Sequence, residues 1–360
     1  MGLLMTNLQK KYGIARKAEC MNNSTIQDKL FDYIKQTKKI GQIHNLTKIT
    51  SGWENEVYLF DLEYDQGEKR DYEELVLRIY QGENVKGKAQ KEFKAMKRLY
   101  ELEFPVPKVY TLETENPIFG NPFVIMEKIS GQMLWKVINE SASGKKIELI
   151  DQFCRIFAQL HNLNWQLLEF PNLPYNPDDP YGYINHLLSW VKKYADQFPE
   201  SRPFQPIFDW LLDNSKMVPC KKPSILHWDY HPANLILKDN GEAIVIDWCG
   251  VDIGDYRADL AWTLLLISSY GNPEARNIVL KTYENIVSHK VEGIEYYEVF
   301  ALARRMVSIY ISMVVGADKL GMRSESVEMM KSNTKHIKAL CDFLREKTGI
   351  TISQFQDYLL

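Results

Sequence analysis

The fold of this chain is best indicated by the segment Ile225-Leu-His-Trp-Asp-Tyr-His-Pro-Ala-Asn-Leu-Ile-Leu-Lys238, which is followed by Ala243-Ile-Val-Ile-Asp-Trp248. It consists of two short apolar runs joined by a polar turn. Asp229 lies where a carboxylate can accept a hydroxyl proton, Asn234 follows five residues later, and Asp247 ends the next predicted strand. This order of carboxylate, amide and second carboxylate is typical of a phosphoryl-transfer centre.

Each polar residue type in this stretch suits one part of such a centre. A hydroxyl nucleophile needs a carboxylate to position it and take its proton, which is the role predicted for Asp229. Mg²⁺ prefers oxygen ligands, so Asn234 and Asp247 are predicted to bind it. His231 is placed to donate to the transferring phosphoryl group, and His227 is interpreted as orienting the loop. The alternative, that these are surface turn residues, is disfavoured by their joint spacing.

Composition and charge are ordinary for a soluble globular protein. The 360 residues suffice for two lobes with their own cores, and 45% of them are hydrophobic and 25% charged. The net charge of −3 and the lack of a long Lys/Arg block argue against a nucleic-acid partner. The sequence contains no run of about 18 apolar residues, so no transmembrane helix is predicted. This argues against a membrane partner. The sequence carries no signal for an oligomeric state.

The cysteines and the N-terminal residues indicate the compartment. Five cysteines without a CxxC pair are typical of reduced thiols, and no secretory signal is recognised. We therefore expect a cytoplasmic protein. If Met21 is an internal start, residues 1–20 are a disordered extension.

The hydrophobic pattern predicts an N-terminal lobe rich in β-strands, residues 1–128, and a mainly helical C-terminal lobe, residues 129–360. In the N-terminal lobe we predict helices over 25–38 and 87–103, two strands within 46–61, and strands over 75–80 and 124–127. Residues 61–74 are interpreted as a charged hairpin connection. In the second helix Phe93, Met96, Leu99 and Tyr100 are expected to face inward.

The C-terminal lobe is expected to consist of helices around one hairpin. The predicted helices cover 147–164, 181–197, 205–215, 258–270, 273–289, 295–316 and 325–346. The only clear strands are 235–238 and 243–246, joined by the turn Asp239-Asn-Gly241. The fold class is therefore α+β, with two lobes.

The loop His227-Trp-Asp-Tyr-His-Pro-Ala-Asn234 resembles the HxDxxxxN catalytic loop of the aminoglycoside phosphotransferase/choline kinase family. These are kinases of small molecules with a protein-kinase-like fold. Asp247-Trp-Cys249 falls where that family has its metal-binding Asp. The family's loop often reads HGDxHxxN, and here Trp228 stands in place of the Gly; Trp228 and Trp248 are interpreted as packing residues.

The resemblance assigns a role to each polar side chain of the motif. It implies that Asp229 is the catalytic Asp and that Asn234 and Asp247 bind magnesium. It also places His231 where protein kinases have their catalytic-loop Lys. Asp259, in the element Asp-Leu-Ala261, is implied to hold the catalytic loop from behind.

The resemblance covers about residues 46–345 and extends to the nucleotide side. Ser51-Gly52 resembles the hairpin that covers the nucleotide, with an ordinary β-turn as the alternative because no GxGxxG is present. Arg78 falls at the phosphate-binding Lys, where a guanidinium can pair with phosphates as a fork. Glu92 is its expected ion-pair partner. A solvent-facing strand residue and a solvated helix charge are the respective alternatives.

The hinge between the lobes is placed at residues 127–129. There the backbone groups of Glu127 to Ile129 are implied to meet an adenine ring. Because side chains take little part in such recognition, the sequence leaves the choice between ATP and GTP open.

The connection after the motif limits the size of the acceptor. Only 11 residues lie between Asp247 and Asp259, whereas protein kinases use a longer segment there to dock a peptide. Acidic and aromatic residues are frequent over 169–213 and would suit a cationic or sugar-like acceptor. A solvated helical face is the favoured alternative. Residues of 295–316, among them Arg304 and Arg305, are further candidates to line the pocket.

Together these features predict an ATP- and magnesium-dependent phosphotransferase that transfers a γ-phosphoryl group to a hydroxyl of a small molecule. The acceptor classes considered are aminoglycoside-like compounds, sugars and amino alcohols, so both an antibiotic-modifying and a metabolic kinase stay open. The alternative from another class is a non-catalytic nucleotide-binding protein on a kinase-like fold. The complete set of Asp229, Asn234 and Asp247 counts against it.

Overall fold

The computed structural model of the chain describes residues 23–36, 40–49, 55–66, 69–82, 84–115, 117–170, 172–320 and 326–357. The chain divides into two compact units. Unit 1 consists of Met1–Gly131 and Lys238–Cys249, and unit 2 consists of Gln132–Leu237 and Gly250–Leu360. The sequence motif is thus shared: its first half belongs to unit 2, whereas Asp247 belongs to unit 1.

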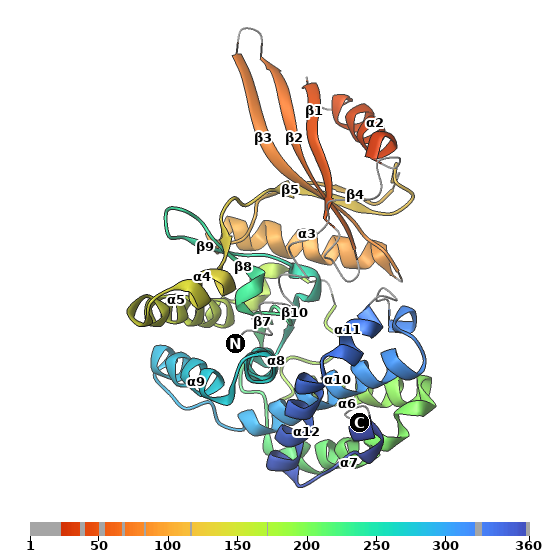
Figure 1. Cartoon of the computed structure of the whole chain (residues 1–360), viewed down its shortest axis with the longest axis vertical. Helices are drawn as coiled ribbons and strands as arrows, with labels where there is room; N and C mark the ends of the chain where they lie inside the picture. Colours follow the sequence, from red (N-terminus) through yellow and green to blue (C-terminus); the bar gives the residue numbers. More distant parts are fainter. Residues whose placement is uncertain are drawn as a thin grey trace. The chain divides into compact units, whose positions relative to one another are not determined.

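Unit 1 is built on one antiparallel sheet (Figure 1). In the order in which they pair, its strands are β1 (Ile40–Ile49), β2 (Glu56–Gln66), β3 (Lys69–Ile79), β5 (Phe123–Glu127) and β4 (Val109–Glu113). The predicted strands over 46–61, 75–80 and 124–127 are confirmed in kind, and β4 was missed.

The prediction of a charged connection over 61–74 was wrong. Strands β2 and β3 run through this segment and pair without a register shift, from Glu56 opposite Ile79 to Gln66 opposite Lys69. The physical reason is that charged residues here alternate with Leu62 and Tyr64. Such a two-faced strand keeps one side in water, so charge alone does not indicate a loop.

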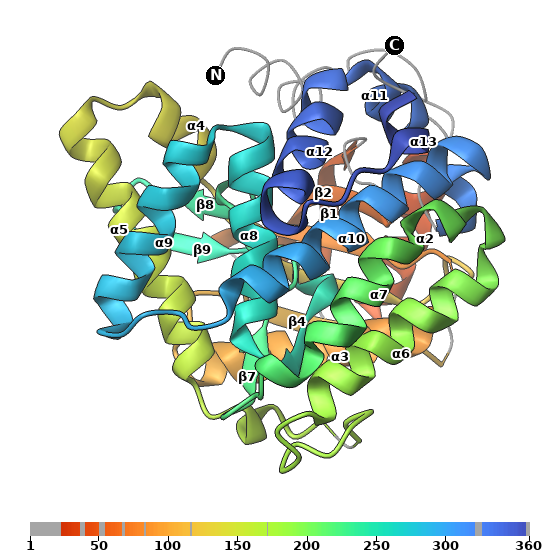
Figure 2. The ribbon, with the colours of Figure 1, turned by 90° about the horizontal axis from the view of Figure 1, so that it is seen from below.

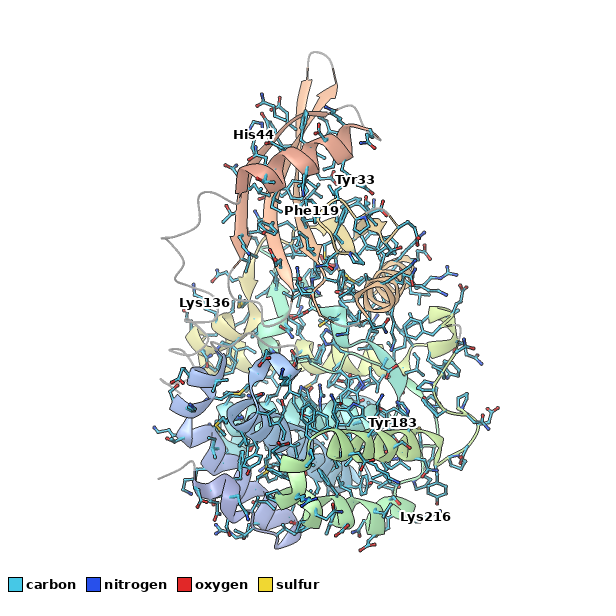
Figure 3. The ribbon with its side chains drawn as sticks, turned by 90° about the vertical axis from the view of Figure 1, so that its right-hand side faces the viewer. Tyr33, His44, Phe119, Lys136, Tyr183 and Lys216 are labelled. Atoms are coloured by element: carbon cyan, nitrogen blue, oxygen red, sulfur yellow. The ribbon has the colours of Figure 1, made fainter. Side chains whose placement is uncertain are left out.

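Helix α2 (Asn23–Lys35) covers one part of this sheet, as the predicted helix over 25–38 anticipated. Its buried Leu30 and Ile34 belong to the same hydrophobic cluster as the inward residues of the strands. Tyr33 meets the ring of Phe123 edge-on at 5.1 Å, and Phe119 meets the same ring at 5.0 Å (Figure 3). The contact of Tyr33 joins helix α2 to strand β5.

Helix α3 (Val85–Glu101) presents one narrow buried stripe. Met96 and Leu99 lie in it as predicted, but Tyr100 is 45% exposed, so its inward assignment was wrong. The stripe instead includes Glu92, which is only 1% exposed. At 3.6 residues per turn, Glu92 shares a face with Met96 and Leu99, whereas Tyr100 is rotated away from that face.

Unit 2 is mainly helical (Figure 2). Its helices are α4 (Leu134–Glu140), α5 (Ser143–Asn162), α6 (Gly182–Gln197), α7 (Gln205–Asn214), α8 (Tyr256–Tyr270), α9 (Pro273–Val287), α10 (Ile294–Val314), α11 (Ser326–Ser332), α12 (Thr334–Thr348) and α13 (Ser353–Gln356). Helix α10 packs against α7, α8 and α12. The single helix predicted over 325–346 is two helices, because Asn333 caps α12 by accepting from the amide of His336. Within the described parts of the chain, no helix has the length and apolar character required to cross a membrane.

The predicted strands over 235–238 and 243–246 are confirmed as β8 (Leu235–Leu237) and β9 (Ala243–Val245). The strands that pair with β8 and with each other elsewhere in unit 2 were not predicted. Strand β7 (Ser224–Leu226) pairs with β10 (Asp252–Gly254), and β6 (Gln132–Met133) pairs with β8 (Leu235–Leu237). Segments of two or three residues are too short to show an alternating pattern. Gly254 allows a close approach in β10, because a Cβ there would lie 2.2 Å from the ring of buried Tyr183.

A buried ion pair fixes the start of α8. Asp255 caps the helix and accepts from the Nη2 atom of Arg257 at 2.6 Å. The same guanidinium donates to the backbone carbonyls of Val218, Pro219 and Glu292. The hydroxyl of Tyr297 on α10 also donates to Asp255, at 3.0 Å. The pair therefore joins the start of α8 to three other segments of unit 2.

We expect Asp255→Ala to lower the free energy of unfolding by about 3–5 kcal/mol, because it leaves the Arg257 guanidinium without its carboxylate in the interior. Urea denaturation followed by circular dichroism measures the change. The control is Asp151→Ala, which removes the exposed partner of Arg155 and is expected to cost less than about 1 kcal/mol. Equal effects of the two substitutions would contradict this assignment.

Candidate active site

The loop after β7 is held by the first turns of α8. The carboxylate of Asp259 is fully buried and accepts from the backbone amides of His227 at 2.6 Å and Trp228 at 2.8 Å. One turn later, the hydroxyl of Thr263 donates to the carbonyl of Tyr230 at 2.6 Å. This agrees with the supporting role expected for Asp259.

Trp228 adopts a backbone conformation that favours glycine. Its φ is +65°, in the left-handed region that side chains other than glycine rarely enter. This geometry gives a physical reason for the glycine that the resembling family often has at this position. Here the hydrogen bond that the Trp228 backbone amide donates to Asp259 holds this conformation in place. The side chain is half-buried and lies over a guanidinium, that of Arg304.

The side chain of Asp229 is oriented by two donors. Its Oδ1 accepts from the indole Nε1 of Trp262 at 3.1 Å, and its Oδ2 accepts from Asn234 Nδ2 at 3.0 Å. His231 Nε2 lies 3.4 Å from the same Oδ2. His227, which is fully buried, accepts from the Asp229 amide through Nδ1 at 3.3 Å. The carboxylate keeps 40% of its surface exposed, so it is both fixed and accessible to an acceptor hydroxyl.

Asn234 is positioned so that its amide oxygen remains available. It is 2% exposed, and its Nδ2 donates to both the carbonyl and the carboxylate of Asp229. Because the nitrogen makes these two bonds, the oxygen is the atom left to meet a cation. An amide oxygen here and the carboxylate of Asp247 are hard oxygen donors, which fit Mg²⁺.

The predicted nucleotide-side residues form a charged cluster within unit 1. Arg78 Nη1 lies 2.6 Å from Glu92 Oε1 and 3.2 Å from Asp247 Oδ1. The hydroxyl of Tyr80 donates to the other oxygen of Glu92 at 2.6 Å. Burial disfavours the charged guanidinium, but Glu92 and Asp247 outweigh it and raise the pKa of Arg78. Arg78 therefore stays charged, and the solvent-facing alternatives for Arg78 and Glu92 do not describe their environment.

Two backbone amides of the segment predicted as a hinge already make hydrogen bonds within unit 1. The amide of Glu127 donates to the carbonyl of Lys108 at 2.8 Å, and the amide of Lys128 donates to Glu74 at 3.1 Å. In the described chain, the amide of Ile129 makes no such bond, so it is the donor available to a ligand. Ser51 and Gly52, predicted to cover the nucleotide, lie outside the described residues.

The sequence reasoning missed two residues next to Asp229 or Glu92. Trp262 follows Asp259 by three residues on α8, so its bond to Asp229 was detectable in principle from the helical spacing. Tyr80 follows Arg78 on the same strand, but no sequence signal indicates its bond to Glu92. Trp248, in contrast, is fully buried and meets Phe104 edge-on, as its packing interpretation predicted.

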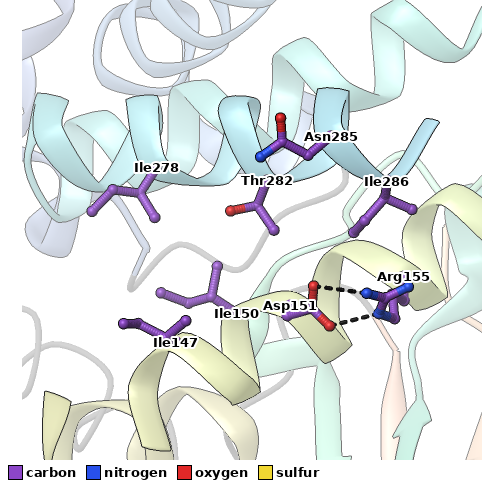
Figure 4. Close-up of a pocket in the computed structure, with 8 residues that line it drawn as sticks. All are labelled: Ile147, Ile150, Asp151, Arg155, Ile278, Thr282, Asn285 and Ile286. Atoms are coloured by element: carbon purple, nitrogen blue, oxygen red, sulfur yellow. Dashed lines mark hydrogen bonds and ion pairs between the residues drawn. The ribbon is translucent and has the colours of Figure 1, made fainter. Parts of the chain in front are cut away.

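A separate cavity of about 400 Å³ lies between α5 and α9 in unit 2 (Figure 4). Four of its eight lining residues are isoleucines, and the ion pair of Asp151 and Arg155 also lines it. None of the predicted site residues lines it. The candidate site is therefore the loop after β7 and not this cavity.

Comparisons with known proteins agree with the motif. The sequence profile described as "Phosphotransferase enzyme family" matches residues 45–294. Among curated proteins, acyl-CoA dehydrogenase family member 11 of Pongo abelii is 29% identical over 178 residues, which make up 48% of this chain. The match spans only 22% of the length of that protein, so most of the relative lies outside the matched region.

Solved structures show the same architecture. Ethanolamine kinase of Plasmodium vivax is similar with a TM-score of 0.60 at 14% identity, covering 95% of each chain. A thermostable mutant of an aminoglycoside phosphotransferase, in ternary complex with AMP-PNP and hygromycin B, has a TM-score of 0.58 at 14% identity. The match covers 91% of this chain and 100% of the phosphotransferase chain. The predicted α+β, kinase-like fold class is confirmed.

The family profile covers well over half of the chain, and it includes Arg78, the loop after β7 and Asp247. The chain therefore belongs to the phosphotransferase enzyme family, the group of aminoglycoside phosphotransferases and choline kinases with a protein-kinase-like fold.

Proposed function

We propose that this chain uses ATP and magnesium to transfer a γ-phosphoryl group to the hydroxyl of a small molecule. The observation that carries the proposal is the accessible carboxylate of Asp229, fixed by Trp262 and Asn234. A carboxylate held in this way can orient a hydroxyl and accept its proton during transfer. Family membership supports the same reaction class.

The acceptor side of the reaction is performed by residues of unit 2. Asp229 hydrogen-bonds the acceptor hydroxyl, directs its lone pair and takes the proton as the new bond to phosphorus forms. His231, held 3.4 Å from Asp229, donates to an oxygen of the transferring group. Because Trp262 and Asn234 already hold the carboxylate, little reorganisation is needed at the moment of transfer.

The nucleotide side is assigned to residues of unit 1. Arg78, kept charged by its carboxylate neighbours, pairs with nucleotide phosphates, and the backbone of Glu127 to Ile129 meets the base. Asp247 and Asn234 would hold magnesium, which when bound neutralises charge on the phosphate oxygens. The AMP-PNP complex of the structurally similar aminoglycoside phosphotransferase supports nucleotide use.

The acceptor is expected to be small. In unit 2 the segment after the motif is occupied, since Asp252–Gly254 form strand β10 against β7 and Asp255 caps α8. This leaves no long segment there on which a polypeptide could dock. Hygromycin B and ethanolamine, named for the two similar structures, are small hydroxylated molecules.

We also propose a cytoplasmic location. Cys154, Cys220 and Cys341 are free thiols. Free thiols are typical of proteins in a reducing compartment.

Asp229→Asn is expected to lower kcat by about a hundred- to ten-thousandfold, because an amide cannot accept the hydroxyl proton. The substitution is isosteric, so nucleotide binding should persist. ADP release over a panel of hydroxylated small molecules measures turnover, and calorimetry measures nucleotide binding. The matched control is Asp213→Asn, an exposed aspartate on α7 of the same unit. Unchanged turnover in folded Asp229→Asn protein would rule out the assigned role.

Magnesium should add to the stabilisation of the chain by ATP. At a ligand concentration about 100 times Kd, bound nucleotide contributes about 2.7 kcal/mol to the free energy of unfolding. We expect EDTA, or Asp247→Asn, to remove most of this gain in a thermal-shift assay. Asp239→Asn, on the exposed turn of the same unit, is the control. Stabilisation by ATP that ignores the metal would instead favour a non-catalytic nucleotide-binding protein.

A further inference from the structure

Three side chains form a stack beside Asp229 in unit 2. The guanidinium carbon of Arg304, on α10, lies 4.0 Å from the ring centre of Trp262 and 4.8 Å from that of Trp228. Trp262 in turn donates to the Asp229 carboxylate. Trp262 therefore contacts both Arg304 and Asp229. We call the arginine and the two tryptophans the Trp228–Arg304–Trp262 stack.

Arg304 has no carboxylate partner in the described part of the chain. Its Nη1 atom is buried and finds no hydrogen-bond acceptor there. Burial lowers the pKa of Arg304, although the negative charge of Asp229 opposes this shift. Two other arginines of unit 2, Arg257 and Arg276, are each paired with a buried carboxylate. Arg304 thus lacks the carboxylate that these two arginines have. The neighbouring Arg305 has no carboxylate among the described residues either, but it donates to His336 and to the hydroxyl of Tyr270.

A second buried polar group near Arg304 also lacks a partner. Tyr183 lies on α6 (Figure 3) and contributes to the electrostatic environment of Arg304. Tyr183 is only 1% exposed, and its hydroxyl finds no hydrogen-bond partner among the described residues. Buried polar groups are nearly always satisfied in folded proteins, so two exceptions in one place need a reason. The faces of Trp228 and Trp262 attract the cation but do not accept its in-plane hydrogen bonds.

We propose that Arg304 binds a carboxylate of the acceptor whose hydroxyl is held at Asp229. This inference rests on the proposed function and names its substrate class, a small hydroxy acid. A guanidinium can bind a carboxylate through two parallel hydrogen bonds, and the flanking tryptophans already hold its plane. Arg304 keeps part of its surface exposed, so a ligand can reach it.

The same cation disfavours a polycationic acceptor. A positive charge fixed next to Asp229 repels an acceptor that carries several ammonium groups. The acidic residues within 169–213 do not offset it, because they lie on exposed faces of unit 2, apart from half-buried Asp179. This supports the interpretation of that segment as a solvated surface.

The test compares matched acceptors in an ADP-release assay with the full chain. The probes are short straight-chain hydroxy acids, the corresponding hydroxy carboxamides, and the cations ethanolamine and hygromycin B. We expect kcat/KM to be higher for each hydroxy acid than for its carboxamide by about ten- to a hundredfold, the value of a charge-assisted hydrogen bond. This comparison needs no substitution, so it does not depend on the folding of a variant.

Arg304→Met should abolish the preference for each hydroxy acid over its carboxamide, measured as the ratio of their kcat/KM values in the same variant, and Arg304→Lys should restore part of that ratio. Arg155→Gln removes an exposed arginine of the same unit and is expected to change nothing. The fold of each variant is checked by its thermal unfolding. Equal kcat/KM for hydroxy acid and carboxamide in the unsubstituted chain, or a preference that survives in Arg304→Met, would overturn the proposal.

A parallel measurement separates this inference from the proposed function. ADP release in the absence of any added acceptor reports transfer of the phosphoryl group to water. If this release does not depend on Asp229, or is absent, the result counts against the phosphotransferase itself. Binding is followed independently, as the thermal shift that each hydroxy acid adds to the chain with AMP-PNP and magnesium. A shift by the carboxylates that requires Arg304 supports the site. The same shift with the carboxamides contradicts it.

Discussion

One buried carboxylate determines where the candidate catalytic loop lies. The carboxylate of Asp259 accepts hydrogen bonds from the two successive backbone amides that precede Asp229, those of His227 and Trp228. Without it both amides would be buried without partners, which folded proteins avoid. The bond also retains the left-handed backbone of Trp228, a conformation that costs about 1–3 kcal/mol in a residue with a side chain. Asp259 follows the buried pair of Asp255 and Arg257 on α8, so one helix start supports both the fold and the site.

The long elements of the fold were predictable because they carry a repeating pattern. Helix α5 buries one face over many turns, and such a periodicity survives errors at the ends. Helix α10 is long and apolar, and most of its first half is buried on all sides. The two-residue and three-residue strands β6, β7 and β10 carry no period. The extension of β2 and β3 was misinterpreted because its exposed face is charged, and only the register with the neighbouring strand shows that both faces belong to one hairpin.

The candidate site was predictable only where its residues lie close in sequence. Asp229, His231 and Asn234 share one loop, and their mutual bonds follow from that loop. Arg304 comes from a helix far along the chain, and a pattern of apolar residues on α10 does not tell which polar side chain faces Asp229. Its position depends on how α10 packs against α8, which is a tertiary property.

The two units differ in how they balance charge around their key arginines. In unit 1, Arg78 meets two carboxylates, Glu92 and Asp247, so that cluster has an excess of one negative charge. In unit 2, Arg304 is held by aromatic faces and meets no carboxylate among the described residues. Partly buried charge is stable when a counter-charge is near, which in an enzyme the ligand can supply. These surroundings are consistent with the two proposals above, in which the ligand supplies a cation beside Asp247 and an anion beside Arg304.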